Sequence, residues 1–285
     1  MTLETALRQG AALLAAQGVA DARLTAEVLL CHALRREKVY LYAHPEHELS
    51  TAEWLHYGRY LHERMKGKPT QYITRRQEFF GREFVVSAEV LIPRPETEHV
   101  VERAARVAPE ARRVLDIGAG SGALAVTLAL EHARDLVVAT DISAGALRVA
   151  RENARRHGVR LALVRTDFAA GLRGPFDLIV SNPPYIPEAE IPHLQHEVRD
   201  WEPRIALAGG VDGAEPYRRI VPDAERLLRP GGWLVVEIGF QIEAAVRALF
   251  GSAWTDVETG FDLARFPRVI SARYAPRRNG KQAEM

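Results

Sequence analysis

The sequence Asp-Leu-Ile-Val-Ser-Asn-Pro-Pro-Tyr at residues 177–185 decides how this chain is organised. Its first part is an apolar run of the kind that forms a buried parallel strand. Pro183 and Pro184 follow, and because prolines lack an N–H donor and have a fixed φ, they can continue neither a strand nor a helix interior. The chain must therefore leave the sheet at Asn182. In open α/β sheets ligands bind at this carboxyl end of the strands, so we expect a ligand site here.

The loop that begins at Asn182 offers two hydrogen-bond acceptors and an aromatic ring. The amide oxygen of Asn182 accepts one hydrogen bond, and the carbonyl of Pro183 accepts a second. Two adjacent acceptors suit an –NH2 group, and Tyr185 can lie over the flat conjugated system that carries this group. The alternative is a proline-rich surface turn with a buried tyrosine. We favour the ligand site because the loop follows a strand and lies downstream of a glycine-rich loop.

Composition sets limits on the class of protein. The chain has 285 residues, which favours two domains, and 47% of them are hydrophobic, enough for sizeable cores. The formal net charge is +1, so bulk charge does not indicate a polyanion-binding protein. The single cysteine, Cys31, excludes an intrachain disulfide and a cysteine-cluster metal site. We see no signal peptide and no apolar run of the roughly 20 residues that would span a bilayer, and we therefore expect a soluble cytoplasmic protein.

The first part of the chain is predicted to be a small helical bundle. Apolar residues recur at helical spacing up to about residue 66. Ser50 and Glu53 form a plausible capping box for the last of these helices, which Gly67 would end. Residues 79–86 are typical of two short strands around a glycine-containing turn. We therefore predict a helical domain over 1–72 and a hairpin linker over 73–92.

The sequence Ile-Pro-Arg-Pro-Glu-Thr-Glu at residues 92–98 has two interpretations. Its prolines force an extended approach, and Pro95 suits the first turn of a helix. Glu96 and Glu98 favour that N-terminus through the helix dipole. Taken alone, the segment is a rigid linker and helix cap. It matters for a ligand only if Arg94 and its neighbours face the Asn182 loop.

From about residue 112 the pattern alternates strand and helix, which predicts a parallel sheet in an α/β domain over 93–274. Its strands are expected at the seven ranges 113–117, 136–140, 161–164, 177–180, 233–237, 254–258 and 267–273. Helices are expected at 217–228 and 242–250, and the long segment 186–213 is expected to be functional or a lid. Glu237 either lines the site or caps a turn, and we favour the cap. The polar tail over 275–285 is expected to be disordered.

A glycine-rich loop follows the first strand of this domain. Three glycines, Gly118, Gly120 and Gly122, come directly after an apolar strand and allow a ligand to approach the backbone closely. The pattern also matches the GxGxxA of dinucleotide-binding proteins, so a nicotinamide cofactor must be considered. The glycine pattern alone does not discriminate between these cofactors.

Two acidic residues follow the next strands. Asp141 lies about 20 residues beyond the glycines, where a carboxylate can hold both hydroxyls of a ribose; it could instead be a helix N-cap, although Ser143 can provide that cap. Asp167 could accept a hydrogen bond from an adenine amino group while Phe168 packs against the ring. The alternative for this pair is an exposed turn.

Together these segments resemble the class I, S-adenosylmethionine-dependent methyltransferases that modify –NH2 groups. The resemblance narrows to the peptide-chain release factor glutamine methyltransferases and covers nearly the whole chain. It rests on the helical N-terminal part, Phe80-Gly81, the segment 92–98, NPPY followed by Ile186, and Trp201-Glu202-Pro203-Arg204. NPPY itself is shared with DNA adenine and cytosine methylases, and Trp201 is a mild departure from the family pattern. The family implies a Rossmann-like, seven-stranded methyltransferase domain joined by a β-hairpin to the helical bundle.

The resemblance also implies a reaction and its residues. The substrate is the glutamine of the Gly-Gly-Gln loop of class I release factors, methylated on its side-chain amide nitrogen, with S-adenosylmethionine as donor and S-adenosylhomocysteine as product. The catalytic residues would be Asn182, Pro183 and Tyr185. The cofactor would contact Asp116, Gly118, Ala119, Gly120, Gly122, Asp141, Ile142, Asp167, Phe168 and Asn182. The substrate would contact Asn182, Pro183, Pro184, Tyr185, Arg94, Pro95, Glu96 and Thr97. No metal is called for, and neither membrane nor direct nucleic-acid binding is expected.

Three rival functions remain open at this point. An amino-methyltransferase acting on DNA or RNA would need a strong basic groove for phosphates, which the near-zero net charge does not favour. A nicotinamide oxidoreductase would use the same glycine loop but leaves NPPY without a role. A cofactor-binding scaffold without activity would have no need of an intact Asn182 loop.

Overall fold

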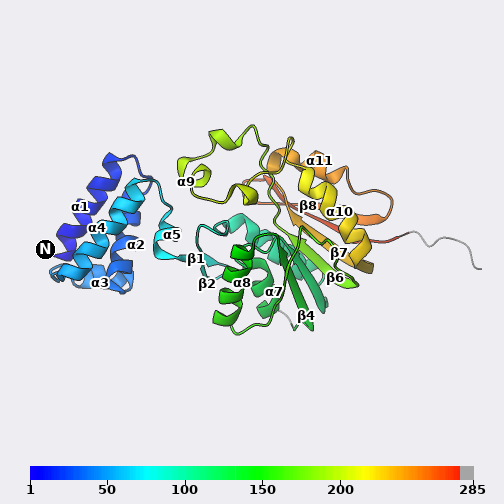
Figure 1. The fold of residues 1–285 in the computed structure, drawn as a ribbon, viewed down its shortest axis with the longest axis horizontal. Coiled ribbons are helices and arrows are strands. Elements are labelled where there is room, and N and C mark those ends of the chain that lie inside the picture. Colours follow the sequence, from blue (N-terminus) through cyan, green and yellow to red (C-terminus); the bar gives the residue numbers. More distant parts are fainter. Residues whose placement is uncertain (132, 277–285) are drawn as a thin grey trace, which may run out of the picture. The chain divides into compact units, whose positions relative to one another are not determined.

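The computed structural model describes residues 1–131 and 133–276, which form two compact units (Figure 1). The first, here the helical unit, consists of residues 1–76 together with 195–201. The second, here the sheet unit, consists of residues 77–194 and the described chain from 202 onward. None of the described helices is long and apolar enough to cross a membrane.

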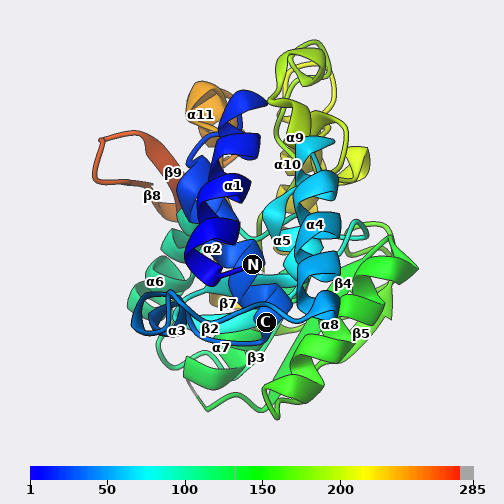
Figure 2. The ribbon, with the colours of Figure 1, turned by 90° about the vertical axis from the view of Figure 1, so that its left-hand side faces the viewer.

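The helical unit is built from amphipathic helices around a core of leucines and Tyr57. Figure 2 shows three of them, α1, α2 and α4, side by side. The predicted capping box is confirmed, because the Ser50 hydroxyl accepts from the Glu53 N–H while the Glu53 carboxylate accepts from the Ser50 N–H. The helices are α1 (Leu3–Ala16), α2 (Ala22–Leu34), α3 (Lys38–Ala43), α4 (Thr51–Met65), α5 (Thr70–Thr74) and α9 (His196–Arg199).

The short helix α9 reaches the helical unit from a distant part of the sequence. Its Glu197 forms an ion pair of 2.9 Å with Arg64, whose guanidinium is almost fully buried. At Gly67 a side chain would collide with the ring of His196, whose nearest atom lies 2.1 Å from the position of the added Cβ. Close packing and an ion pair with a buried arginine therefore hold the segment 195–201 against the end of α4.

The predicted hairpin is present as β1 (Arg76–Phe79) and β2 (Arg82–Val85). Its two turn residues, Phe80 and Gly81, both have positive φ, at 51° and 68°. This is the backbone sign that a two-residue hairpin turn requires, because such turns match the right-handed twist of the strands.

The described part of the sheet unit contains a seven-stranded sheet with the order β5-β4-β3-β6-β7-β9-β8. The five strands from β3 to β7 are parallel, and β9 pairs antiparallel with β7 and β8. All seven predicted strands are present. They are β3 (Arg113–Ile117), β4 (Leu136–Asp141), β5 (Ala162–Arg165), β6 (Phe176–Ser181), β7 (Leu228–Glu237), β8 (Trp254–Phe261) and β9 (Pro267–Tyr274).

Helices cover both faces of this sheet (Figure 1). They are α6 (Glu98–Val107), α7 (Ala123–Glu131), α8 (Ala144–Arg156), α10 (Glu215–Leu227) and α11 (Glu243–Arg247), with 3-10 turns η1 (Pro95–Thr97), η2 (Ile191–His193), η3 (Arg204–Ala206) and η4 (Phe240–Ile242). Successive strand residues alternate between the two cores. Val180 and Val235 pack with α6 and α7, whereas Ile179 and Leu234 pack with α10.

Two predicted helices have other bounds in the structure, and the strand predicted over 233–237 begins earlier, at Leu228. The predicted helix over 242–250 is divided into η4 and the shorter α11, and the predicted helix over 217–228 begins earlier, at Glu215. In the second case Pro216 occupies the first turn, where a missing N–H is not needed for the helix. The predicted disordered tail lies outside the described residues from 277 onward. Ala275, its first residue, still donates its N–H to the carbonyl of Ala253 at 2.8 Å.

Candidate functional site

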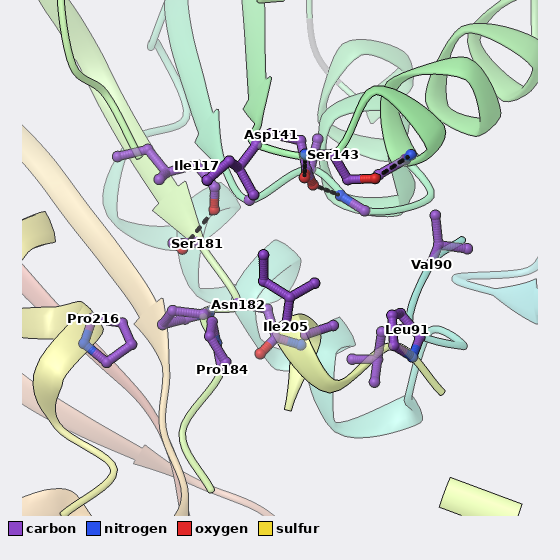
Figure 3. A pocket seen from close by; sticks show the side chains of 18 of the residues that line it. Val90, Leu91, Ile117, Asp141, Ser143, Ser181, Asn182, Pro184, Ile205 and Pro216 are labelled. Carbon is purple, nitrogen blue, oxygen red and sulfur yellow. Dashed lines mark hydrogen bonds between the residues drawn. The ribbon is translucent and has the colours of Figure 1, made fainter. Parts of the chain in front are cut away.

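The strand order reverses between β3 and β6, and a cavity lies at this point. From β3 the chain continues to β4 and β5 on one side, and returns with β6 and β7 on the other. Because adjacent loops at such a reversal separate, this is the usual ligand site of an open parallel sheet. The cavity has a volume of about 340 Å³, within the range of about 300–1,000 Å³ typical of small-molecule sites. Figure 3 shows Asp141 and Ser143 on one side of it and Asn182 and Pro184 on another.

The predicted glycine loop forms one wall. Residues 118–121 line the cavity, and Gly118 and Gly120 have φ values of 79° and 53°. This left-handed backbone is unfavourable for residues with a side chain. Apart from the adjacent residues of the chain, no described atom lies within 4 Å of a Cβ built on either glycine, so the backbone faces open space in which a ligand can approach. Gly122 does not line the cavity; a Cβ there would lie 3.1 Å from that of Ala150.

Asp116 is fully buried and does not line the cavity. Its Oδ2 accepts a hydrogen bond of 3.2 Å from the Ala125 N–H. Its Oδ1 has no hydrogen-bond partner among the described residues. Burial, together with the charge of Asp141, raises the pKa of Asp116 to about 7, against the opposing effect of the Ala125 hydrogen bond. Its predicted contact with the cofactor stays a prediction.

Asp141 and Ile142 line the cavity at the end of β4. The Asp141 carboxylate accepts from the Ser143 N–H at 2.8 Å and from the Gly120 N–H at 2.9 Å. Ser143 is the N-cap of α8, since its hydroxyl accepts from the N–H of Ala146. Asp141 thus joins the glycine loop to the next strand, and its oxygens still have lone pairs for a ligand's hydroxyl groups.

Asp167 and Phe168 line the cavity beyond β5, and they meet a residue that the sequence did not indicate. The guanidinium of Arg219, on α10, lies 4.4 Å from the centre of the Phe168 ring and 2.7 Å from the Asp167 carboxylate. Arg219 also lines the cavity. No motif marks this arginine, because it comes from a helix more than 50 residues downstream.

The NPPY loop supplies the opposite wall. Asn182, Pro183 and Pro184 line the cavity, and Asn182 donates a hydrogen bond of 2.9 Å from Nδ2 to the hydroxyl of Thr97. Ser181, just before the loop, donates to the carbonyl of Ile117 at 2.6 Å, which joins β6 to β3 at the cavity edge (Figure 3).

Only part of the segment 92–98 lines the cavity. Pro93 and Thr97 line the cavity, whereas Arg94, Pro95 and Glu96 do not. Arg94 instead pairs at 2.5 Å with Glu202, whose side chain is buried. Two segments on which the family resemblance rested are therefore joined by an ion pair. The predicted contacts of Arg94, Pro95 and Glu96 with a substrate stay predictions.

Tyr185 does not line the cavity. Its ring packs against the core on the α10 face, and a Cβ at Gly239 would lie 2.9 Å from the ring. Its hydroxyl donates to Oε1 of Glu237 at 3.4 Å, and burial raises the pKa of Tyr185 above its ordinary value. The predicted stacking of Tyr185 on a substrate amide stays a prediction.

Glu237 does not cap a turn, so that expectation is wrong. Its side chain is buried at the end of β7, and its carboxylate meets Tyr185 and the hydroxyl of Thr97. Burial raises the pKa of Glu237 to about 7.

The long segment 186–213 supplies a third, largely apolar wall. Together with Val90 and Leu91 it surrounds the cavity with hydrophobic surface suited to a flat organic ligand. Its lining residues are Pro203, Ile205, Ala206, Ala208, Gly209 and Gly210.

Comparison with known proteins places both units in described families. Residues 5–74 match the PrmC N-terminal domain, and residues 97–198 match the Methyltransferase small domain. The chain is 42% identical to a release factor glutamine methyltransferase of Koribacter versatilis over 277 residues, covering 96% of this chain and 99% of that one. It is 46% identical to a release factor glutamine methyltransferase of Geobacter sulfurreducens, covering 91% and 92%.

A solved structure shows the same fold. The ribosomal protein L11 methylase of Lactobacillus delbrueckii subsp. bulgaricus matches with a TM-score of 0.51 at 20% identity, covering 70% of this chain and 90% of that one. At this identity the likeness concerns the fold of the methyltransferase domain alone.

Proposed function

Because the chain belongs to the family of release factor glutamine methyltransferases, we propose that it methylates the side-chain amide nitrogen of the glutamine in the Gly-Gly-Gln loop of class I release factors. The methyl donor is S-adenosylmethionine. The observation that carries the proposal is the amide of Asn182, held by its nitrogen to Thr97 at the wall of the cavity. With the nitrogen engaged, the oxygen of this amide is the end that can accept from a substrate –NH2 group.

The residues around the cavity fit S-adenosylmethionine. The backbone of Gly118 to Gly120 would hold its amino acid end, and Asp141 would hold its ribose. Asp167 and Phe168 would bind the adenine, with Ile142 against the ring. When bound, this group supplies a methyl group on a positively charged sulfur that leaves as a neutral thioether.

The protein's own residues would make the substrate's amide nitrogen, a weak nucleophile, more reactive. The lone pair of an amide nitrogen is delocalised into the carbonyl. Acceptance of its two N–H bonds by the Asn182 oxygen and the Pro183 carbonyl returns electron density to the nitrogen and aims it. Holding two reactants in line contributes at best about 7–11 kcal/mol to lowering a barrier.

The transfer forms one bond and breaks another. The methyl group would move from the donor's sulfur to the amide nitrogen, so that a nitrogen–carbon bond would replace the sulfur–carbon bond, and one proton would then leave the nitrogen. The leaving thioether is neutral and needs no acid. Asn182 or water takes the proton away, so the mechanism requires no strong general base.

The nature of the substrate also bears on where the enzyme acts. Release factors work on the translating ribosome, and we place the enzyme in the cytoplasm with them. The partner is the release factor protein itself, and the proposal requires no direct contact with nucleic acid.

The test uses methyl-labelled S-adenosylmethionine and two purified release factors, one intact and one with the loop glutamine replaced by alanine. We expect label on the intact factor only. Label on DNA or RNA and on neither factor would contradict the proposed substrate and favour a nucleic-acid amino-methyltransferase.

The Asn182→Ala variant tests the assigned chemistry. We expect kcat to fall about 10²–10³-fold, as when one preorganised hydrogen-bond partner is removed from a transition state. The Kd for S-adenosylmethionine should change far less, because the glycine loop and Asp141 remain. Equal and small losses in both quantities would contradict the assignment.

A further inference from the structure

Strand geometry brings Asn182 and Glu237 to the same face of the sheet. β6 and β7 are parallel neighbours, in which Val180 pairs with Val235 and Ser181 with Val236. Val180 and Val235 both pack in the core on the α6 face. Because side chains alternate along a strand, the residues two positions further, Asn182 and Glu237, emerge on that face as well.

Thr97 lies between these two side chains. It ends η1 directly before α6, and its side chain is 4% exposed. Its hydroxyl oxygen accepts from Asn182 Nδ2 at 2.9 Å, and the hydroxyl lies near enough to the Glu237 carboxylate to lower its pKa. The chain therefore places an amide, a hydroxyl and a carboxylate close together, and the hydroxyl and the carboxylate are buried.

The direction of these hydrogen bonds follows from the groups themselves. An ionised carboxylate only accepts, so a carboxylate at Glu237 attracts the single hydroxyl proton of Thr97. The Thr97 oxygen must then accept from Asn182, which requires the –NH2 end of that amide. The amide oxygen is consequently directed away from Thr97. Hydrogen bonds in series also polarise one another, which makes the Asn182 oxygen a better acceptor.

We propose that Thr97 and Glu237 are positioning residues that orient the Asn182 amide, so that its oxygen rather than its –NH2 group faces the substrate nitrogen. This inference rests on the proposed function. With the opposite orientation two –NH2 groups would face each other, and neither could accept a hydrogen bond. The ionised carboxylate of Glu237, through Thr97, selects the productive orientation.

Protonation of Glu237 removes this preference for one orientation of the Asn182 amide. A protonated carboxyl can donate to Thr97, whose own proton is then free to point at Asn182 and favour the reversed amide. Besides Thr97, four groups act on Glu237. The hydroxyl of Tyr185 donates to its carboxylate and that of Tyr217 to its backbone carbonyl, Glu96 raises its pKa, and Arg268 lowers it. With burial as the largest effect, the pKa of Glu237 is raised to about 7, so the reversal falls within a testable pH range.

The orientation is measured without reference to activity. The chain has three asparagines, at positions 153, 182 and 279, so selective ¹⁵N-asparagine labelling yields three side-chain –NH2 signals in the full-length protein. The –NH2 signal that disappears in Asn182→Gln is the one that belongs to Asn182. We expect this signal to shift with pH between about 5.5 and 8.5 in the wild type and to be constant in Glu237→Gln and Thr97→Val. The signal of Asn153, whose –NH2 group is bound to two backbone carbonyls, is the internal control.

Kinetics supply the second measurement. We expect Thr97→Val to lower kcat about 10²-fold, the size of effect that a misplaced group produces, with the Kd for S-adenosylmethionine within about threefold of the wild type. Thr97→Ser, which keeps the hydroxyl, should restore kcat to within about fivefold. The kcat of the wild type should fall as the pH drops below about 7, and this limb should be absent from Glu237→Gln.

The outcomes separate the two proposals. A wild-type enzyme that leaves the release factor unlabelled overturns the proposed function, while the Asn182 signal still decides the orientation. An Asn182 signal that titrates identically in Glu237→Gln, or equal losses of kcat in Thr97→Ser and Thr97→Val, overturns the inference even if methylation proceeds normally.

Discussion

Asn153 is the residue whose truncation should damage the sheet unit most clearly. It lies on α8, fully buried, and makes three hydrogen bonds to backbone groups of other segments. Its Oδ1 accepts from the Val85 N–H at 2.7 Å, and its Nδ2 donates to the carbonyls of Val85 and Ser121, each at 2.9 Å. One side chain thus joins the hairpin strand β2 to the glycine loop of the cavity.

Asn153→Ala leaves three buried backbone groups without partners. Each such group costs about 1–3 kcal/mol, and some relaxation of β2 recovers part of the sum. We expect the free energy of unfolding of the sheet unit to fall by about 3–5 kcal/mol. At roughly 2–4 °C for each kcal/mol in a domain of this size, Tm should fall by about 6–20 °C.

Calorimetry with and without S-adenosylmethionine is the assay, because the transition that the ligand raises belongs to the unit that binds it. The matched control is Glu152→Ala at the neighbouring exposed position of α8, which should stay within about 0.5 kcal/mol of the wild type. A loss below about 1 kcal/mol in Asn153→Ala would refute the reasoning, since it would mean that the three backbone groups find other partners.

Asn153→Asp tests the same contacts with almost no change in shape. The new carboxylate would be buried against the carbonyls of Val85 and Ser121, so its pKa would be raised above that of the unfolded chain. A raised acid pKa means that stability is lost as the pH rises above the unfolded value of about 4. The deficit in Tm relative to the wild type should therefore shrink as the pH falls from 8 to 5, and a deficit independent of pH would contradict this environment.

Three further predictions concern the cavity. Arg219→Ala should weaken S-adenosylmethionine binding about fivefold with little change in kcat, measured by isothermal titration, because a contact of about 1 kcal/mol over Phe168 is lost. Gly120→Ala should weaken that binding by more than about tenfold, since φ is 53° and the added methyl group enters the ligand's space. The control is Gly81→Ala, at φ 68° in the hairpin turn, which should affect stability alone. Asp116→Asn should lack a pH dependence of stability that the wild type shows. In the wild type the free energy of unfolding should fall as the pH rises from about 4 to about 7, because the buried carboxyl has a pKa of about 7 and its Oδ1 has no hydrogen-bond partner among the described residues. Urea unfolding at several pH values measures this.

The strands and their order along the chain can be predicted from the sequence because burial requires a run of adjacent apolar residues. A parallel strand covered on both faces must be apolar at nearly every position, as at 178–180 and 234–236. The ends of helices are less predictable from the sequence. The predicted helix over 242–250 is divided because tertiary contacts, rather than periodicity, determine where the short η4 and α11 begin and end.

Several residues of the candidate site were also predicted to lie together. The glycine loop, Asp141, the Asp167–Phe168 pair and the Asn182 loop line one cavity, because the carboxyl ends of parallel strands meet at one edge of a sheet. Glu237 shows the limit of this reasoning. The face of β7 on which Glu237 lies can be predicted from the alternation of side chains in the sequence. The residues that Glu237 contacts depend on which strand lies beside β7.

By itself, the sequence determines the local chemistry of this protein: which segments are strands, where prolines force the chain out of the sheet, and which backbone positions need glycine. These features depend on the covalent structure and burial of a few adjacent residues. The tertiary structure alone decides the rest. It places Arg219 over Phe168, packs α9 with the helical unit, and sets Thr97 between Asn182 and Glu237. The physical reason is that a hydrogen bond or ring contact depends on distances of a few ångströms between residues that lie up to 140 positions apart, and only the packed sheet determines those distances.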